Sequence, residues 1–309
     1  MTGKQCIGLV TIAFCCCLYW NAKHRSRPIP LPPDPIDVPV PRPAPTPDAV
    51  DPEFVLLSAF TNQTERSIFG DVMAHAPNGP VGGGRSTNAH ETSHDIHAYL
   101  RNRNKSRFKH PINAVYCLDN RGVILEEPLI LKSQVCEFVP ACLRNCRYET
   151  YLSGAKEWDR QPLFIVDEWV AYTIGAKVNV EDVQEGRYRA VRGGGVADMN
   201  WSCRLAGQSG YGDGRTDGVS GCLHLSIFST AMCMAIEKHD REYWETNQQF
   251  RRFMVWWMKE AHRTYMAGNA MQEFNWEMFD NSRKDLRTHA DAEPMRGFLR
   301  ENFGGVWLE

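Results

Sequence analysis

NAHETSHDIHAYL, residues 88–100, is the stretch that decides how this chain is interpreted. It places three histidines and one glutamate within about two helical turns: His90, Glu91, His94 and His97. The preceding PNGPVGGGRST, residues 77–87, is rich in glycine and predicts a loop. We therefore expect a helix that begins with Asn88 as its N-cap residue and ends near Arg101.

The spacing within this helix predicts a metal site. His90 and His94 are four residues apart, so both side chains project from one face of a helix and can bind one zinc ion. Glu91 lies about 100° round the helix from His90, where it can reach a water molecule bound to that ion. This H-E-x-x-H pattern is short enough to arise by chance, and an exposed polar helix face is the alternative.

A catalytic zinc ion needs a third protein ligand. His97 lies in the same row of the helix as the first two histidines, so it cannot surround the ion with them. The segment PLFIVDEWVAYTIGA, Pro162–Ala176, predicts a buried helix that contains Asp167 and Glu168. A buried carboxylate is costly unless it is paired or binds a cation. We expect Glu168 to be the third ligand.

Two alternatives for Glu168 stay open at this point. The carboxylate can pair with an arginine instead of a metal, for which Arg85 and Arg101 are the candidates, or it can lie at a partly exposed helix start. Ala171, Gly175 and Ala176 are small, so they allow a neighbouring helix to approach closely. A metal ion that is bound by side chains of two helices requires such a close approach.

These two segments together resemble the gluzincin metallopeptidases, in which a downstream Glu-x-x-Ala helix supplies the third zinc ligand. The resemblance covers only H-E-x-x-H and the helix of Glu168, about 90 residues from end to end. Tyr172 stands where many members have aspartate. The resemblance implies a zincin-like domain in which His90, His94 and Glu168 bind one zinc ion and Glu91 acts as general base and acid.

A peptidase site also needs a donor that stabilises the oxyanion of the transition state. Tyr172 lies four residues after Glu168 on the same helix face, and we expect it to fill this role. Three other residues remain candidates: Tyr151, His224 and His239. Asp95 or Asp167 can orient a ligand histidine from behind, and the sequence does not choose between them.

The rest of residues 52–309 predicts a single, mostly helical α+β domain with a small β-sheet. Two apolar runs within Ile112–Leu131 flank Asp119–Gly122 and predict a hairpin. Further helices are expected at about 133–152 (interrupted at Pro140), 219–238, 242–266 and 294–302. Seven cysteines lie beyond residue 20, and this odd number leaves both disulfides and free thiols open.

The N-terminal residues predict attachment to a membrane. An apolar run from Cys6 to Trp20 within residues 1–27 is typical of a signal or signal-anchor segment. Residues 28–51 are rich in proline and predict an extended linker. Basic residues after the run favour a cytoplasmic C-terminal side, so sidedness stays open; we lean to a membrane-anchored or secreted protein with an extracytoplasmic catalytic domain.

These observations predict a zinc metallopeptidase that hydrolyses peptide bonds in a peptide or protein substrate. The net charge of −2 gives no reason to expect a nucleic-acid partner. One alternative is a tethered surface-interaction domain whose metal site is structural or degenerate. Another is a zinc hydrolase that acts on a non-peptide amide or ester.

Overall fold

The computed structural model describes residues 51–62, 65–81, 83–187, 214–271 and 281–309. All of them fall within one compact unit, Pro43–Glu309. The predicted signal-anchor segment and nearly all of the proline-rich linker lie outside the described residues. Within them, the predicted fold class is confirmed, because the domain is mostly helical and has a small antiparallel sheet.

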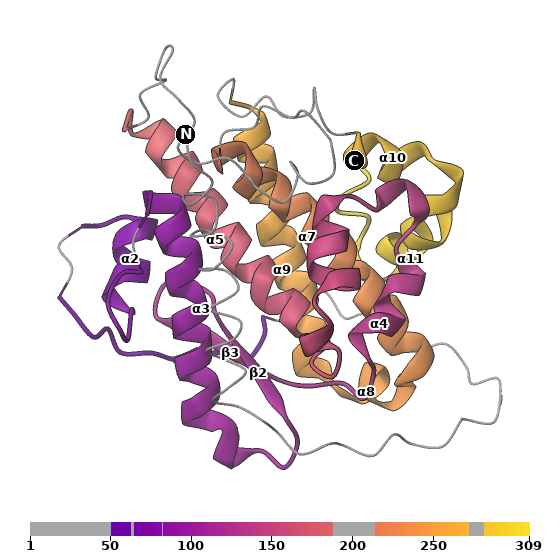
Figure 1. Cartoon of the computed structure of the whole chain (residues 1–309), viewed down its shortest axis with the longest axis horizontal. Helices are drawn as coiled ribbons and strands as arrows, with labels where there is room; N and C mark the ends of the chain where they lie inside the picture. Colours follow the sequence, from indigo (N-terminus) through magenta and orange to yellow (C-terminus); the bar gives the residue numbers. More distant parts are fainter. Residues whose placement is uncertain (1–50, 63–64, 82, 188–213, 272–280) are drawn as a thin grey trace, which may run out of the picture. The chain divides into compact units, whose positions relative to one another are not determined.

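Helix α5, Phe164–Gln184, is the central element of the domain (Figure 1). Helix α3, Arg85–Asn104, packs along one side of α5. Helices α7, Gly214–His239, and α9, Gln248–Asn269, pack on another side. Nearly every α5 residue from Ile165 to Val180 is buried, which explains why its sequence is apolar almost all round.

The sheet has three antiparallel strands in the order β1-β3-β2 and contacts both α3 and α5. β2, Ile112–Tyr116, pairs with β3, Arg121–Glu126, and β1 is the short edge strand Val55–Leu56. The predicted hairpin is therefore confirmed, although its turn ends at Asn120, because Arg121 and Gly122 already belong to β3. In its turn, three successive residues have left-handed backbone: Leu118, Asp119 and Asn120. Asparagine and aspartate adopt this conformation more readily than most residues, which explains the polar Asp-Asn sequence.

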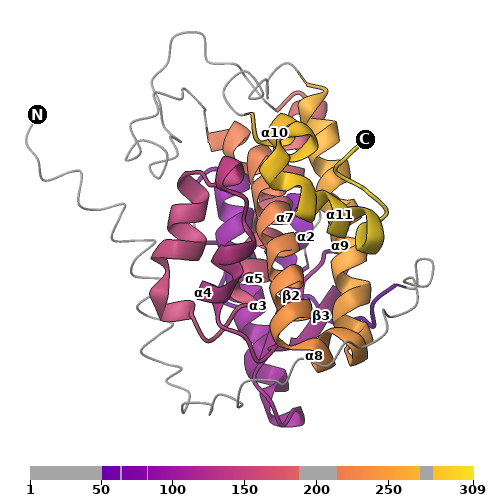
Figure 2. The same cartoon turned by 90° about the vertical axis from the view of Figure 1, so that its right-hand side faces the viewer.

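Shorter helices complete the domain. α2, Ile68–Ala74, packs beside α3, and α8, Arg241–Thr246, precedes α9. α10, Ser282–Thr288, and α11, Glu293–Phe303, lie over α7 and α9 (Figure 2). The segment 132–158 is more broken than its sequence predicts, with α4 at Lys132–Val135 followed by short 3₁₀ turns and a π-helical segment, Tyr148–Gly154.

The expectation that Asn88 caps the histidine helix is wrong. α3 begins three residues earlier, at Arg85, with Gly84 as its N-cap residue. The Asn88 side chain instead accepts a hydrogen bond from the backbone N–H of Val81, at 3.0 Å, and another from Thr92 Oγ1. Asn88 therefore fixes the loop that leads into α3.

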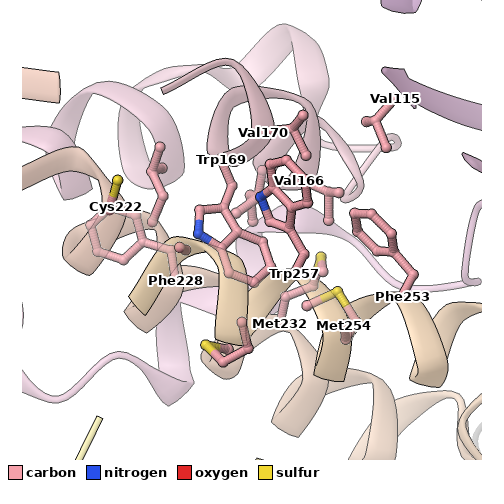
Figure 3. Packing of buried hydrophobic residues seen from close by; sticks show 14 of the residues in the cluster. Val115, Val166, Trp169, Val170, Cys222, Phe228, Met232, Phe253, Met254 and Trp257 are labelled. Carbon is pink, nitrogen blue, oxygen red and sulfur yellow. The ribbon is translucent and has the colours of Figure 1, made fainter. Parts of the chain in front are cut away.

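The apolar core lies between α5, α7 and α9. Trp169 and Val166 of α5 interdigitate with Phe228 of α7 and Trp257 of α9 (Figure 3). Among the described residues, Gly218–His239 within α7 is the one helical stretch long and apolar enough to cross a membrane. However, 94% of its most apolar window is buried inside the domain, as expected of a core helix.

The described cysteines include both kinds that the sequence left open. Cys146 is disulfide-bonded. The other five are free thiols: Cys117, Cys136, Cys142, Cys222 and Cys233. Three of these five, Cys117, Cys222 and Cys233, are buried and contribute to the apolar core.

Candidate metal centre

The structure brings together the three residues that the sequence predicts as metal ligands. His90 and His94 lie one turn apart on α3, and Glu168 faces them from the first turns of α5. His94 Nε2 lies 3.1 Å from His90 Nε2, and Glu168 Oε2 lies 3.6 Å from the former and 3.8 Å from the latter. Two segments 74 residues apart therefore supply one group of donors.

The size of this triangle fits a metal ion. The point in its plane that is equidistant from the three atoms lies about 2.0 Å from each, a distance typical of bonds from histidine nitrogen and carboxylate oxygen to a metal such as zinc. The side chains are largely but not fully buried, with exposed fractions of 17% for His90, 27% for His94 and 11% for Glu168. The donor group is thus partly accessible to solvent.

Close packing of the two helices makes this arrangement possible. Gly175 lies where an added Cβ would be 3.2 Å from Ser86 O and 3.5 Å from His90 Cβ. Ser86 Oγ donates a hydrogen bond to Gly175 O at 3.0 Å. Gly175, which the sequence predicts to allow close packing, therefore lets α3 and α5 approach each other beside Ser86 and His90.

Asp167, the residue before Glu168, lies behind His94. His94 Nδ1 is 2.6 Å from Asp167 Oδ1, so this carboxylate, rather than Asp95, is the one that contacts a histidine of the donor group. His97 Nδ1 lies 2.9 Å from the same oxygen, and Arg101 donates to Asp167 Oδ2. The arginine pairing considered for Glu168 is therefore made by Asp167, while Arg85 pairs with Glu65 and Asp182.

The charges in this region explain the pKa shifts of the site. Burial alone would raise the pKa of Asp167, but His97 and Arg101 and the hydrogen bonds from His94 and His97 hold it well below its usual value. Burial alone would lower the pKa of His94, yet Glu168 and Asp167 raise it well above its usual value. The two carboxylates therefore favour positive charge at His94.

Glu91 lies beside His90, where its charge raises the pKa of that histidine against the stronger lowering effects of burial and of His94. Its side chain is partly exposed and makes no hydrogen bond or ion pair to any residue in the described part of the chain. Glu91 is therefore close enough to His90 for its charge to act on that ring.

Tyr172 also lies at the site, as its spacing from Glu168 predicts. Its ring meets the His90 ring edge to face, with centroids 4.6 Å apart, and its hydroxyl is 2.8 Å from that of Tyr151. Tyr151 lies in the π-helical segment, where the buried Lys132 donates to its backbone carbonyl at 3.0 Å. Two of the candidate oxyanion donors therefore form a pair.

The other two oxyanion candidates lie elsewhere. His224 is buried between Arg147 and Ser282, with Arg147 NH1 2.6 Å from His224 Nδ1. His239 packs against Phe138. In the interactions described for this chain, neither contacts a residue of the donor group.

Two further groups of potential ligands exist among the described residues. His94, His97 and Asp167 offer atoms within 4.8 Å of one another. Arg101 is already in contact with that carboxylate, so a second cation there would be repelled. The third group is Cys142, His289 and Asp291, in which the last two are exposed.

Comparison with known proteins adds no relative. No family model, curated protein or solved structure matches this chain. The resemblance to gluzincins therefore rests on the two short motifs alone, and the function has to be argued from the geometry of the site.

Proposed function

We propose that this protein is a zinc-dependent metallopeptidase. The observation that carries this proposal is the triangle of His90 Nε2, His94 Nε2 and Glu168 Oε2, whose sides of 3.1 to 3.8 Å fit one zinc ion. Two histidines and one glutamate are the ligands of a known type of catalytic zinc site, in which the fourth position is left for water or substrate. The partial exposure of His90 and His94 agrees with such an open position.

The chemical identity of the donors favours zinc over other common cations. Calcium and magnesium prefer sites made entirely of oxygen, whereas two imidazole nitrogens suit zinc and other late transition metals. The second carboxylate, Asp167, contacts the opposite nitrogen of His94, as is typical of histidines that bind metal. A bound zinc ion would supply an acidified water molecule and polarise the substrate carbonyl.

Glu91 is the proposed general base and acid. It projects from the same helix turn as both histidine ligands, its carboxylate has no partner among the described residues, and it is partly exposed. A carboxylate in that position can take a proton from the attacking water and later transfer it to the leaving amine. Glu91 therefore supplies the proton transfers, while the histidines and Glu168 supply the binding site.

Tyr172 and Tyr151 are the proposed oxyanion donors. When one hydroxyl donates to the other across 2.8 Å, the proton of the accepting hydroxyl remains available for a substrate oxygen. Burial, followed by the neighbouring Tyr172 and Glu168, raises the pKa of Tyr151 well above its usual value, so this group keeps its proton at neutral pH. The contact of Tyr172 with His90 places the pair beside the donor group.

We further propose that the catalytic domain is tethered to a membrane and acts on peptide or protein substrates near it. The support is the apolar run Cys6–Trp20 followed by a proline-rich linker. An extracytoplasmic position of the domain agrees with the disulfide bond of Cys146. An alkaline-carbonate extraction of membranes from expressing cells would test the tether, since a spanning segment resists extraction.

The test of the enzymatic proposal combines metal analysis with hydrolysis of a library of internally quenched peptides. The purified protein is expected to contain zinc that is lost in His94→Ala and retained in His110→Ala, because His110 is exposed and outside the donor group. Glu91→Gln is expected to retain zinc and lose hydrolysis by a factor of about 100 or more.

Two outcomes would contradict the proposal. A folded protein without zinc, or with zinc that His94→Ala leaves unchanged, would show that the triangle is not a metal site. In the other outcome, the protein binds zinc as expected, but it hydrolyses no peptide in a way that depends on Glu91. That result would favour a binding domain with a structural metal or a hydrolase of another amide or ester.

A further inference from the structure

Four residues of α3 form a single stripe toward α5. Their spacing is four, three and four residues, which keeps them on one helix face over three turns: His90, His94, His97 and Arg101. The first two reach Glu168 on α5, and the last three all contact Asp167. The proposed catalytic role uses only the first half of this stripe, so the second half needs its own explanation.

Asp167 is the acceptor at the centre of the second half. Its side chain is 6% exposed, and its oxygen Oδ1 is shared by His94 Nδ1 at 2.6 Å and His97 Nδ1 at 2.9 Å. Arg101 binds the other oxygen and also donates to Asn113 Oδ1 at 2.8 Å. Both oxygens of this carboxylate are therefore engaged, so its orientation is fixed from two sides.

The tautomer of His94 follows from these contacts. An ionised carboxylate only accepts hydrogen bonds, so Nδ1 of His94 must carry the proton that it donates to Asp167. In the neutral ring, the lone pair is then on Nε2, the atom that faces His90 and Glu168. That is the tautomer in which His94 can bind a metal through Nε2.

His97 makes this arrangement specific. It is fully buried, and its Nε2 has no hydrogen-bond partner among the described residues. A proton on that nitrogen would be an unpaired buried donor, so His97 is held with its proton on Nδ1, where it donates to Asp167.

We propose that His97 and Arg101 are positioning residues that act through Asp167 to fix the tautomer and ring orientation of the metal ligand His94. This inference rests on the metal site of the proposed function but not on its peptidase activity. Carboxylates that contact a ligand histidine are typically worth a factor of 10 to 100 in metal affinity. The stripe extends this support by one further helical turn.

The first experiment measures zinc affinity by chelator competition on the full-length protein. All variants are made in the Glu91→Gln background, so activity plays no part in the result. Asp167→Asn is expected to weaken zinc binding by about 10- to 100-fold. Asp95→Asn is the matched control, since Asp95 is on the same helix but has no partner among the described residues, and it is expected to leave the affinity unchanged.

The second experiment separates hydrogen bonding from packing at His97. His97→Leu keeps the bulk and removes the donor, and we expect a loss of about 10-fold in zinc affinity. His97→Asn places an amide N–H close to the position of Nδ1, and we expect it to restore most of the affinity. Arg101→Met is expected to weaken binding, and Arg101→Lys to lie between this variant and the parent.

A spectroscopic measurement tests the tautomer itself. In histidine-labelled protein without zinc, the ¹⁵N shifts of His94 should show the Nδ1–H tautomer as the main neutral form, and Asp167→Asn, whose amide can also donate to Nδ1, should increase the Nε2–H tautomer. Unchanged zinc affinity in His97→Leu together with an unchanged His94 tautomer in Asp167→Asn would overturn the inference while leaving the proposed function intact. Absence of zinc from the parent protein would instead overturn the proposed function.

Discussion

Around Trp169, the face of α5 that packs against α7 and α9 is apolar, whereas the face that packs against α3 contains buried charge. On the first face, Trp169 lies among Phe228 and Trp257, and all three are at most 1% exposed (Figure 3). On the second, Asp167 and Glu168 meet a stripe of three histidines and one arginine. Both faces are buried, but apolar packing surrounds the first, whereas hydrogen bonds and ion pairs surround the second.

This difference shows that one helix has two separate tasks. The apolar face stabilises the domain through burial, which needs volume and shape but little direction. The polar face positions donors, which needs directed hydrogen bonds and a complete set of partners. Substitutions on the two faces should therefore change different quantities: the free energy of unfolding on one face, and zinc affinity on the other.

The largest expected effect on stability is that of Trp169→Ala. Removing this fully buried ring leaves a cavity between α5, α7 and α9, and we expect the free energy of unfolding to fall by about 3–5 kcal/mol. Chemical denaturation measures this loss. Trp256→Ala is the control, because Trp256 is partly exposed and packs edge-on against Phe54. Equal losses in both variants would contradict the comparison.

A second prediction concerns the start of α5 and its dependence on pH. Glu127 Oε2 accepts a hydrogen bond from Leu163 N, the residue before the helix, at 3.0 Å. Burial raises the pKa of Glu127 to about 8, although the bond from Leu163 and the charge of Arg101 act in the opposite direction. The native state therefore keeps a proton that the unfolded chain releases near pH 4.5.

The sign follows from proton linkage. Between about pH 4.5 and pH 8 the native state binds more protons than the unfolded state, so this group makes stability fall as pH rises. We expect Glu127→Gln, which keeps the acceptor for Leu163, to remove a slope of up to about 1.4 kcal/mol per pH unit. Urea denaturation across this range measures it, with Glu126→Gln as control. If the unfolding free energy of the parent and of Glu127→Gln changed with pH in parallel, the raised pKa of Glu127 would be contradicted.

Much of the fold could be predicted from the sequence, because long apolar patterns reveal α5, α7 and α9, and the Asp-Asn turn reveals the hairpin. The start of α3 could not be predicted, since the side chain of Asn88 accepts a hydrogen bond from Val81 N–H instead of capping the helix. The short helices α2 and α10 were not predicted either. Their seven-residue sequences depend on packing against other elements more than on their own periodicity.

The candidate donor group could be predicted because His90 and His94 are one helical turn apart, and because a carboxylate such as Glu168 in an apolar helix needs a partner. The supporting network could not be assigned, because whether Asp95 or Asp167 lies behind His94 depends on how α3 and α5 rotate against each other. One signal was present in the sequence: the four-three-four spacing continues from His94 to His97 and Arg101. That spacing indicates a face that contacts one partner throughout.

Gly221 tests the boundary between the two faces. An added Cβ would lie 2.3 Å from Cδ1 of Tyr172, the residue whose ring also contacts His90. We expect Gly221→Ala to cost about 1–3 kcal/mol in unfolding free energy and to displace Tyr172. The proposed oxyanion role then predicts a fall in kcat with little change in zinc content. Unchanged stability would show that Tyr172 moves without cost.

The smallest effects are expected from a pair of helical glycines. Alanine is intrinsically favoured over glycine inside a helix by about 1 kcal/mol. Gly297 of α11 has no atom within 4 Å of an added Cβ, so Gly297→Ala should raise the free energy of unfolding by about 0.5–1 kcal/mol. At Gly175, contact with Ser86 O at 3.2 Å and with His90 Cβ opposes this gain.

Gly175→Ala should therefore give no increase in stability, and it should weaken zinc binding by moving α3, and with it His90, away from Glu168. Denaturation and chelator competition on the two variants measure both effects. If Gly175→Ala stabilised the protein as much as Gly297→Ala and left zinc affinity unchanged, the close approach of α3 and α5 would not be what sets the spacing of the donor group. The polar face of α5 would then tolerate added volume as an open surface does.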